Sequence, residues 1–220
     1  MSQEVGDQMD ESTDVATDFT QTIDFSKATS SDPALTVFFS KPESLKEVWA
    51  VSKDSNISLT ATQGATQTKR VYIKSENATY VYSDATKAWV KTEGSQLSPA
   101  SIFYPVDPRG SLFYLSKVES FEDLGSETVS DISAKKLKIV LKKSTVQELL
   151  TAANPALAKI KYTDVIIDDL EVLAWIDENN QIVKVTVAGD VEVTSDLYNG
   201  PVTIKADGTY KYQAQTVAKP

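Results

Sequence analysis

Two apolar segments on either side of a polar tetrapeptide, residues 177–180, limit most strongly what this chain can fold into. Residues 173–176 read Leu-Ala-Trp-Ile, and after the tetrapeptide Val183, Val185 and Val187 alternate with Lys and Thr. Alternation with a period of two is typical of a strand with one apolar face, and a short polar segment between two such runs is typical of a hairpin turn. The pattern predicts an antiparallel hairpin whose apolar face carries the three valines.

Similar strand patterns fill the first half of the chain. They occur at residues 19–25, 35–39, 45–51, 57–62, 69–74, 79–82 and 88–91. Short polar turns separate them, which favours an antiparallel meander because parallel strands need long crossover connections. A further strand is predicted where Leu137, Ile139 and Leu141 alternate with lysines, and strands return between residues 165 and 216.

Two segments have helical patterns. Ser98-Pro99 and Asp107-Pro108 each place a capping residue before a proline, and Leu112, Leu115 and Val118 then fall on one helical face. Residues 145–148, Thr-Val-Gln-Glu, have the pattern of a capping box. The apolar positions of that second helix are Val146, Leu149, Leu150 and Ala153, and Asn154-Pro155 is expected to end it.

These elements predict an α+β, mainly β protein: one antiparallel sheet of roughly ten strands, with two or three short helices covering one face. Residues 1–18 contain six acids and no Lys or Arg, so we expect a flexible acidic tether there and a single domain over residues 19–220. A few helices cover a long sheet only partly. Either large side chains fill the space between the layers, or a ligand does.

Composition limits the function. The net charge is −9, and the chain has no His and no Cys. Nucleic acid is not an expected partner, because binding phosphates requires a basic face. Nucleophile–imidazole pairs and thiolate or imidazole zinc sites cannot form. We predict no catalytic residue, no metal ligand and no cofactor, and an enzyme is kept only as a third interpretation because carboxylate chemistry remains possible.

Five segments match a known family in order and spacing. They are Tyr80-Val81-Tyr82 with Trp89-Val90-Lys91, residues 105–112 (Pro-Val-Asp-Pro-Arg-Gly-Ser-Leu), residues 125–129, the hairpin at residues 175–187, and residues 195–204. Together they resemble the LppX/LprG lipoproteins, within the LolA/LolB-like carriers of bacterial envelopes. Ser111 is an insertion relative to the family pattern. The residues before Tyr72 do not align with it, and the lipobox Cys is absent from this numbering.

The resemblance implies a strongly curved half-barrel whose concave face is covered by helices, with an apolar cavity for acyl chains. It also implies an exported, cell-envelope lipoprotein, a monomer whose signal peptide and N-terminal lipid anchor precede this sequence, with acyl lipid or lipoglycan as partner. The alternative is a structural or sensory cell-surface domain of the same fold with a filled core. No segment of the sequence approaches 18 consecutive apolar residues.

The residues that would line an acyl cavity are the apolar positions of the two helices and of the inward-facing strands. They are Leu112, Leu115, Val118, Leu137, Ile139, Leu141, Val146, Leu149, Leu150, Ala153, Ala174, Ile176, Val183, Val185 and Val187. The same residues are also what a filled core requires.

One basic concentration stands out in this acidic chain. It consists of Lys135, Lys136, Lys138, Lys142 and Lys143. Alternating lysines are typical of a solvated strand face that resists edge pairing. The functional interpretation is contact with anionic lipid headgroups at a membrane surface.

Overall fold

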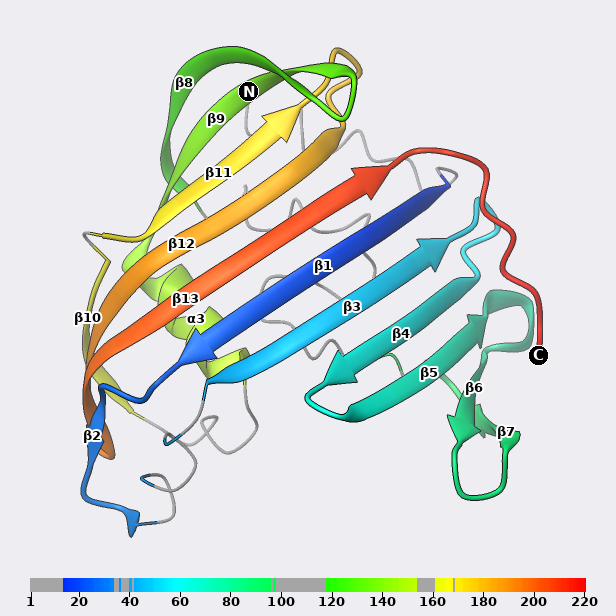
Figure 1. The fold of residues 1–220 in the computed structure, drawn as a ribbon, viewed down its shortest axis with the longest axis horizontal. Helices are drawn as coiled ribbons and strands as arrows, with labels where there is room; N and C mark the ends of the chain where they lie inside the picture. Colours follow the sequence, from blue (N-terminus) through cyan, green and yellow to red (C-terminus); the bar gives the residue numbers. More distant parts are fainter. Residues whose placement is uncertain are drawn as a thin grey trace.

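The computed structural model describes residues 14–33, 36, 40, 42–95, 97, 118–153, 161–167 and 169–220, and the side chains of Glu43, Glu148, Leu149, Thr151, Ala152 and Ala153 are not part of the description. Within these residues thirteen strands form one antiparallel sheet (Figure 1). The strands are β1 (Val15–Asp24), β2 (Thr29–Ser30), β3 (Glu43–Val51), β4 (Ile57–Gln63), β5 (Thr66–Ile73), β6 (Ala78–Ser83), β7 (Ala88–Glu93), β8 (Val118–Val129), β9 (Ile132–Leu141), β10 (Tyr162–Ile166), β11 (Glu171–Ile176), β12 (Ile182–Ser195) and β13 (Tyr198–Lys211). A 3-10 turn, η1 (Lys74–Glu76), and one helix, α3 (Lys143–Ala153), complete the described elements.

The sheet is open and its order is β7-β6-β5-β4-β3-β1-β13-β12-β11-β9-β8, with β10 paired to β12 and β2 to β13. Strands β3 to β7 form the predicted meander. Strand β1 lies between β3 and β13, so that Phe19 is opposite both Glu47 and Gly208. The mainly β, antiparallel class is confirmed. The sheet has thirteen strands rather than roughly ten. Among the described residues one α-helix, α3, covers the sheet, rather than two or three.

Most predicted strands lie within a few residues of the observed ones. The segment 35–39 is an exception: Thr36 is helical, and its N–H donates to the carbonyl of Asp32 at 3.0 Å. The strand predicted there is wrong at Thr36, because a local hydrogen bond replaces sheet pairing. Strand β1 begins at Val15, so it overlaps the last four residues of the expected acidic tether.

The second predicted helix is confirmed as α3, which ends at Ala153, directly before Asn154-Pro155. It begins at Lys143, two residues before the predicted capping box, and the carbonyl of Lys142 accepts from Thr145 and Val146 N–H. The first predicted helix lies outside the described residues except for Val118. That residue begins β8, so its assignment to a helix is wrong. No helix in the described part of the chain is long and apolar enough to span a membrane.

The sheet has two distinct faces, which we call inner and outer. The inner face carries Phe19, Ala174 and Val187, which belong to the main hydrophobic cluster together with residues of α3. Along β1 the odd positions are buried and the even positions are exposed or half-buried. Because strand side chains alternate, even residues such as Asp18 mark the outer face. The core of the molecule therefore lies between the inner face and the segments that cover it.

A glycine in β12 allows the chain between β10 and β11 to pass close to the sheet. Gly189 has φ +145°, and a Cβ there would lie 2.0 Å from the carbonyl oxygen of Asp169. It stands between the part of β12 that pairs with β11 and the part that pairs with β10. A side chain at this position would strain the backbone and also force the Asp169 segment away.

We predict that Gly189→Ala lowers the free energy of unfolding by more than about 2 kcal/mol, since it combines a disfavoured φ with a backbone clash. Gly64→Ala is the matched control: Gly64 also has a positive φ, +57°, but no atom lies within 4 Å of its Cβ position. The control should cost about 1–2 kcal/mol, the cost of a left-handed φ alone. Urea unfolding of both variants tests this, and equal losses would contradict the close approach.

The last residues of the chain form an extended strap, residues 212–220, that leaves β13 and reaches β6 (Figure 1). Val217 packs against a second hydrophobic cluster, which comprises Val71, Ile73, Ala78 and Tyr80. This cluster lies on the outer face, because the neighbouring Tyr72 packs against the main cluster instead. The strap therefore covers an outer-face apolar patch that β5 and β6 would otherwise expose.

Glu76 anchors the end of the strap. Its carboxylate accepts from Lys219 Nζ at 2.8 Å and from the Tyr80 hydroxyl at 2.6 Å, and Lys91 Nζ lies 3.3 Å away. The Lys219 ammonium also lies 5.5 Å from the centre of the Tyr80 ring. Hydrogen bonds from Lys219, then from Tyr80 and Lys91, lower the pKa of Glu76 to about 2.

We predict a pH dependence from this anchor. A carboxyl whose pKa is lowered on folding stabilises the fold above its unfolded pKa, about 4.3, and loses that contribution as pH falls towards the folded value. The difference in melting temperature between wild type and Glu76→Gln should be constant above about pH 5 and disappear towards pH 2. Asp84→Asn removes the exposed Asp84–Lys87 pair and should change little at any pH. A wild-type advantage that persists at pH 2 would contradict the anchor.

Candidate functional site

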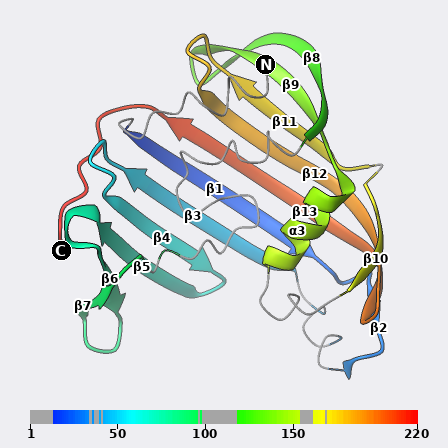
Figure 2. The ribbon, with the colours of Figure 1, turned by 180° about the vertical axis from the view of Figure 1, so that it is seen from behind.

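Helix α3 lies on the inner face of the sheet, as the view from behind shows (Figure 2). Its residues Val146 and Leu150 are 1% and 0% exposed, and they belong to the same cluster as Ala174 and Val187 of the sheet. The apolar spacing of the helix therefore matches the apolar face of the strands. The interface between α3 and the inner face is the candidate site.

Most of the residues predicted to line an acyl cavity lie together at this interface. The main cluster contains Leu137, Ile139, Leu141, Val146, Leu150, Ala174, Ile176 and Val187, and the half-buried Val118 and Val185 pack against it. Leu112 and Leu115 lie outside the described residues, as do the side chains of Leu149 and Ala153. Whether any of these residues contacts a lipid stays a prediction.

Val183 is the exception, and its predicted face is wrong. The pairing of β11 with β12 shifts between Trp175, which is opposite Lys184, and Ile176, which is opposite Ile182. One extra residue, Val183, is accommodated by this β-bulge. Ile182 therefore joins the main inner-face cluster, while Val183 packs with Trp175 on the outer face. The sequence contains no glycine or proline at this point that would indicate the bulge.

An aromatic group at one end of the inner face was not anticipated. The rings of Phe25 and Tyr162 both meet the ring of Tyr198 edge to face, with centroids 5.8 and 6.3 Å apart. The Tyr198 and Tyr162 hydroxyls lie 3.4 Å apart, and burial raises the pKa of Tyr198. These residues lie in or beside three different segments, so only the three-dimensional fold brings them together.

The described interior is closely packed at its centre. Ala174 and Leu150 expose 0% of their surface and Val146 exposes 1%. Side chains this buried do not border a water-sized space. An acyl chain that reached them would therefore have to separate α3 from the sheet.

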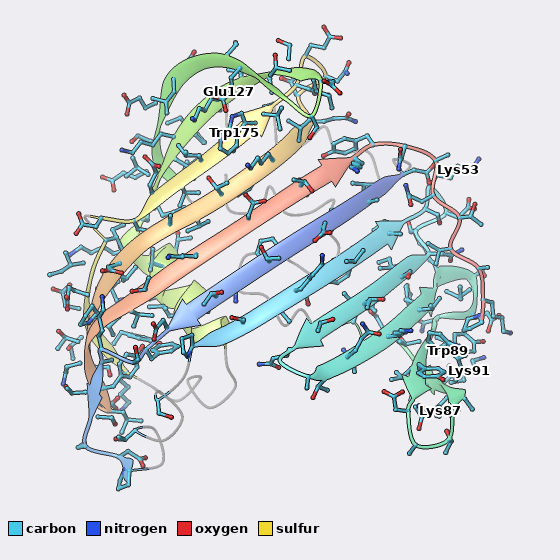
Figure 3. The ribbon with its side chains drawn as sticks, in the orientation of Figure 1. Lys53, Lys87, Trp89, Lys91, Glu127 and Trp175 are labelled. Carbon is cyan, nitrogen blue, oxygen red and sulfur yellow. The ribbon has the colours of Figure 1, made fainter. Side chains whose placement is uncertain are left out.

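The outer face opposite this interface is polar but carries one buried tryptophan. Trp175 is 5% exposed, and its indole N–H donates to Glu127 (Figure 3). The ammonium groups of Lys136 and Lys184 lie 5.1 and 5.3 Å from the centre of its ring. Two cations and a carboxylate thus shield an aromatic ring that would otherwise face solvent.

The five lysines predicted to contact a membrane do not share one surface. Lys136 and Lys138 lie on the outer face. Lys135 is adjacent to Lys136 in the strand and so lies on the opposite face, where its ammonium is 2.8 Å from Asp123. Lys142 and Lys143 lie at the junction of β9 and α3, and Lys143 Nζ is 3.3 Å from Asp164. Neighbouring acids thus neutralise much of this charge, and contact with a membrane stays a prediction.

The outer face also has a shallow groove of about 380 Å³ over β1, β3 and β13. Its lining includes Asp18, Thr20, Asp207 and Lys211. They surround the smaller apolar side chains of Ala16 and Val48 with polar and charged groups, so the groove suits an acyl chain less well than the inner face does. Among the described residues no group of three acidic, His or Cys side chains could hold a metal ion.

Comparison with known proteins supports the fold. No family model and no curated protein matches the chain. Among solved structures, Mycobacterium tuberculosis lipoprotein LppX has a TM-score of 0.51 at 13% identity, over 99% of this chain and 96% of that one. LprF from Mycobacterium bovis gives 0.46 at 12% over 100% and 96%, and the LolA superfamily protein NE2245 from Nitrosomonas europaea gives 0.37 at 10% over 99% and 97%.

The likeness to LppX covers nearly the whole of both chains, and its TM-score is above 0.5. It confirms the resemblance found in the sequence at the level of the fold. The chain has an LppX-like fold: one large, open, antiparallel sheet with a helix on one face.

We predict that Leu150→Ala lowers the free energy of unfolding by about 2–5 kcal/mol, because it leaves a cavity in a fully packed interface. Val90→Ala, at a side chain that is 51% exposed, should change it by less than about 0.5 kcal/mol. Chemical unfolding measures both. A loss below about 1 kcal/mol for Leu150→Ala would show that this side chain already borders empty space.

Proposed function

We propose that this protein binds the acyl chains of a lipid or lipoglycan between the inner face of the sheet and α3, and carries them without covalent chemistry. The observation that supports this most directly is the single apolar cluster shared by the sheet and the helix. A short helix that packs on a sheet through apolar side chains can separate from it and leave two apolar walls. Val146 and Leu150 are such side chains.

The strength of binding follows from the apolar area buried. Each acyl methylene removed from water contributes about 0.8 kcal/mol. About ten buried methylenes give about 8 kcal/mol, which corresponds to a micromolar dissociation constant before the cost of separating α3 from the sheet is subtracted. Such binding should depend little on salt, because it involves burial of area rather than charge.

The setting that we propose is the outside of a bacterial cell membrane. The fold is that of LppX, which is described as a lipoprotein. On this proposal the chain is an exported, monomeric envelope domain, held at the membrane by an N-terminal lipid anchor that precedes the present sequence.

The close packing between α3 and the sheet favours a second candidate function. If α3 does not move, the same fold serves as a structural or sensory cell-surface domain with a filled core. Ala174 and Leu150, both at 0% exposure, fit this alternative as they stand. The two functions differ in one measurable property, the uptake of lipid.

The test is to purify the protein from a lipid-containing host and to analyse it by native mass spectrometry and organic extraction. We predict copurified acyl lipid, and micromolar binding of a fluorescent fatty acid by delipidated protein. Val187→Phe places a ring on the inner face and should lower uptake about tenfold or more, because it occupies the space that a chain would use. Val183, which the β-bulge places on the outer face, provides the control position.

Val183→Phe changes the same residue type in the same strand, but on the outer face. It should overpack its surroundings to a similar degree, typically at a cost of about 1–3 kcal/mol, and leave lipid uptake unchanged. No lipid after extraction and no probe binding to the wild type would instead establish the filled-core alternative. Equal effects of the two substitutions would show that lipid binds somewhere other than the inner face.

A further inference from the structure

The inner face is not uniformly apolar. Thr17 and Gln21 of β1 and Glu47 of β3 are 3%, 6% and 0% exposed, and all three occupy inward positions among residues of the main cluster. Buried polar groups weaken a core unless they are hydrogen-bonded, and a filled core does not require them. Their presence on the face that we propose for lipid binding requires an explanation.

The strand register brings these three residues together. Thr17 is opposite Trp49, Phe19 is opposite Glu47, and Gln21 is opposite Leu45. Glu47 is therefore the diagonal neighbour of both Thr17 and Gln21 on one face, a separation of about 7–8 Å or less between such positions. The indole N–H of Trp49 donates to Glu47 Oε2 at 3.4 Å. Together they form a polar strip near the middle of the sheet.

One member of the strip has an unused hydrogen-bonding group. Across the described part of the chain, the Thr17 hydroxyl is a buried side-chain oxygen that has no hydrogen-bond partner. Valine has the same shape as threonine and no polar atom, so packing alone does not account for a threonine here. A ligand hydroxyl placed beside it would satisfy it, because a hydroxyl both donates and accepts.

The neighbouring carboxyl group restricts the kind of ligand. The oxygens of Glu47 accept hydrogen bonds from hydroxyl groups, and moving a charged phosphate from water to a buried, largely apolar face is costly. The inner face around the strip is apolar, with Phe19 and Leu59 among the adjacent residues of the cluster. This combination suits an uncharged headgroup with free hydroxyls that is attached to an acyl chain.

We infer that Thr17 and Glu47 form a polar subsite on the inner face that binds the hydroxyl groups of an uncharged lipid headgroup, such as a glycerol or a sugar. The inference rests on the proposed function, because the headgroup reaches the strip only when acyl chains enter beneath α3. It adds to that function a preference among lipids: hydroxyl-bearing neutral lipids over lipids with an anionic phosphate.

Three ligands with the same acyl chain test the preference: 1-monooleoylglycerol, methyl oleate and 1-oleoyl lysophosphatidic acid. Delipidated protein should bind monooleoylglycerol about fivefold to tenfold more tightly than methyl oleate, as expected for one or two added hydrogen bonds. It should bind the lysophosphatidic acid most weakly. Isothermal titration calorimetry or displacement of a fluorescent fatty acid measures the three dissociation constants.

Thr17→Val should remove most of the advantage of monooleoylglycerol and leave methyl oleate binding within about twofold. Without ligand it should leave the melting temperature equal or higher, since it removes a buried hydroxyl without changing shape. Thr20→Val, at an exposed outer-face position of the same strand, is the control and should not change the ligand order.

The outcomes separate the two proposals. If none of the three ligands binds, the proposed function fails and the subsite fails with it. If all three bind with similar affinity and Thr17→Val changes nothing, the lipid-binding function stands and the polar subsite is wrong. A melting temperature that falls by several degrees in Thr17→Val would likewise contradict the subsite, because it would show that the hydroxyl stabilises the unliganded fold.

Discussion

The pairing of β1 with β13 is the interaction on which the rest of the structure depends. It joins residues about 190 positions apart, from Ala16 opposite Lys211 to Asp24 opposite Thr203. On one side of it lies the meander β3–β7, and on the other lie β12, β11, β9 and β8. Neither part alone would present a continuous inner face. Contacts between such distant residues also form late and slowly during folding, because the loop entropy must be overcome first.

The sequence predicts the strands well because each carries its own signal. Alternation at Leu137, Ile139 and Leu141, or at Val185 and Val187, is a local property, and the structure places all five side chains in or against the main cluster. The turn at residues 177–180 is equally local: Asp177 N–H donates to Gln181, and the Asp177 carboxylate accepts from two backbone N–H groups. Such features require no knowledge of distant parts of the chain.

The errors arise where pairing overrides the local pattern. Val183 continues a strict alternation, yet the bulge opposite Ile176 turns it to the outer face. Val118 continues a helical spacing but begins β8, where it pairs with Leu141. The polar strip was missed for a related reason. Thr17, in a stretch expected to be a tether, and Glu47, in a strand, are each unremarkable in sequence, and only the register of β1 and β3 places them together inside.

On the proposed function, the burial of an acyl chain must compensate for the packing of α3 on the sheet. α3 has eleven residues, too few for a stable isolated helix in water, so its position depends on tertiary contacts. Exposing the buried Val146 and Leu150 costs about 1.5–3 kcal/mol for each side chain, or about 3–6 kcal/mol together. About ten acyl methylenes contribute about 8 kcal/mol. The cost of separating α3 from the sheet is subtracted from this gain, so tight binding requires a longer chain than the acyl area alone would indicate. Over β11, β12 and β13 the outer face is polar, because of ion pairs such as Lys184–Asp207 and the cations over Trp175. On the proposed function, an acyl chain therefore gains more by entering beneath α3 than by lying on this polar part of the outer face.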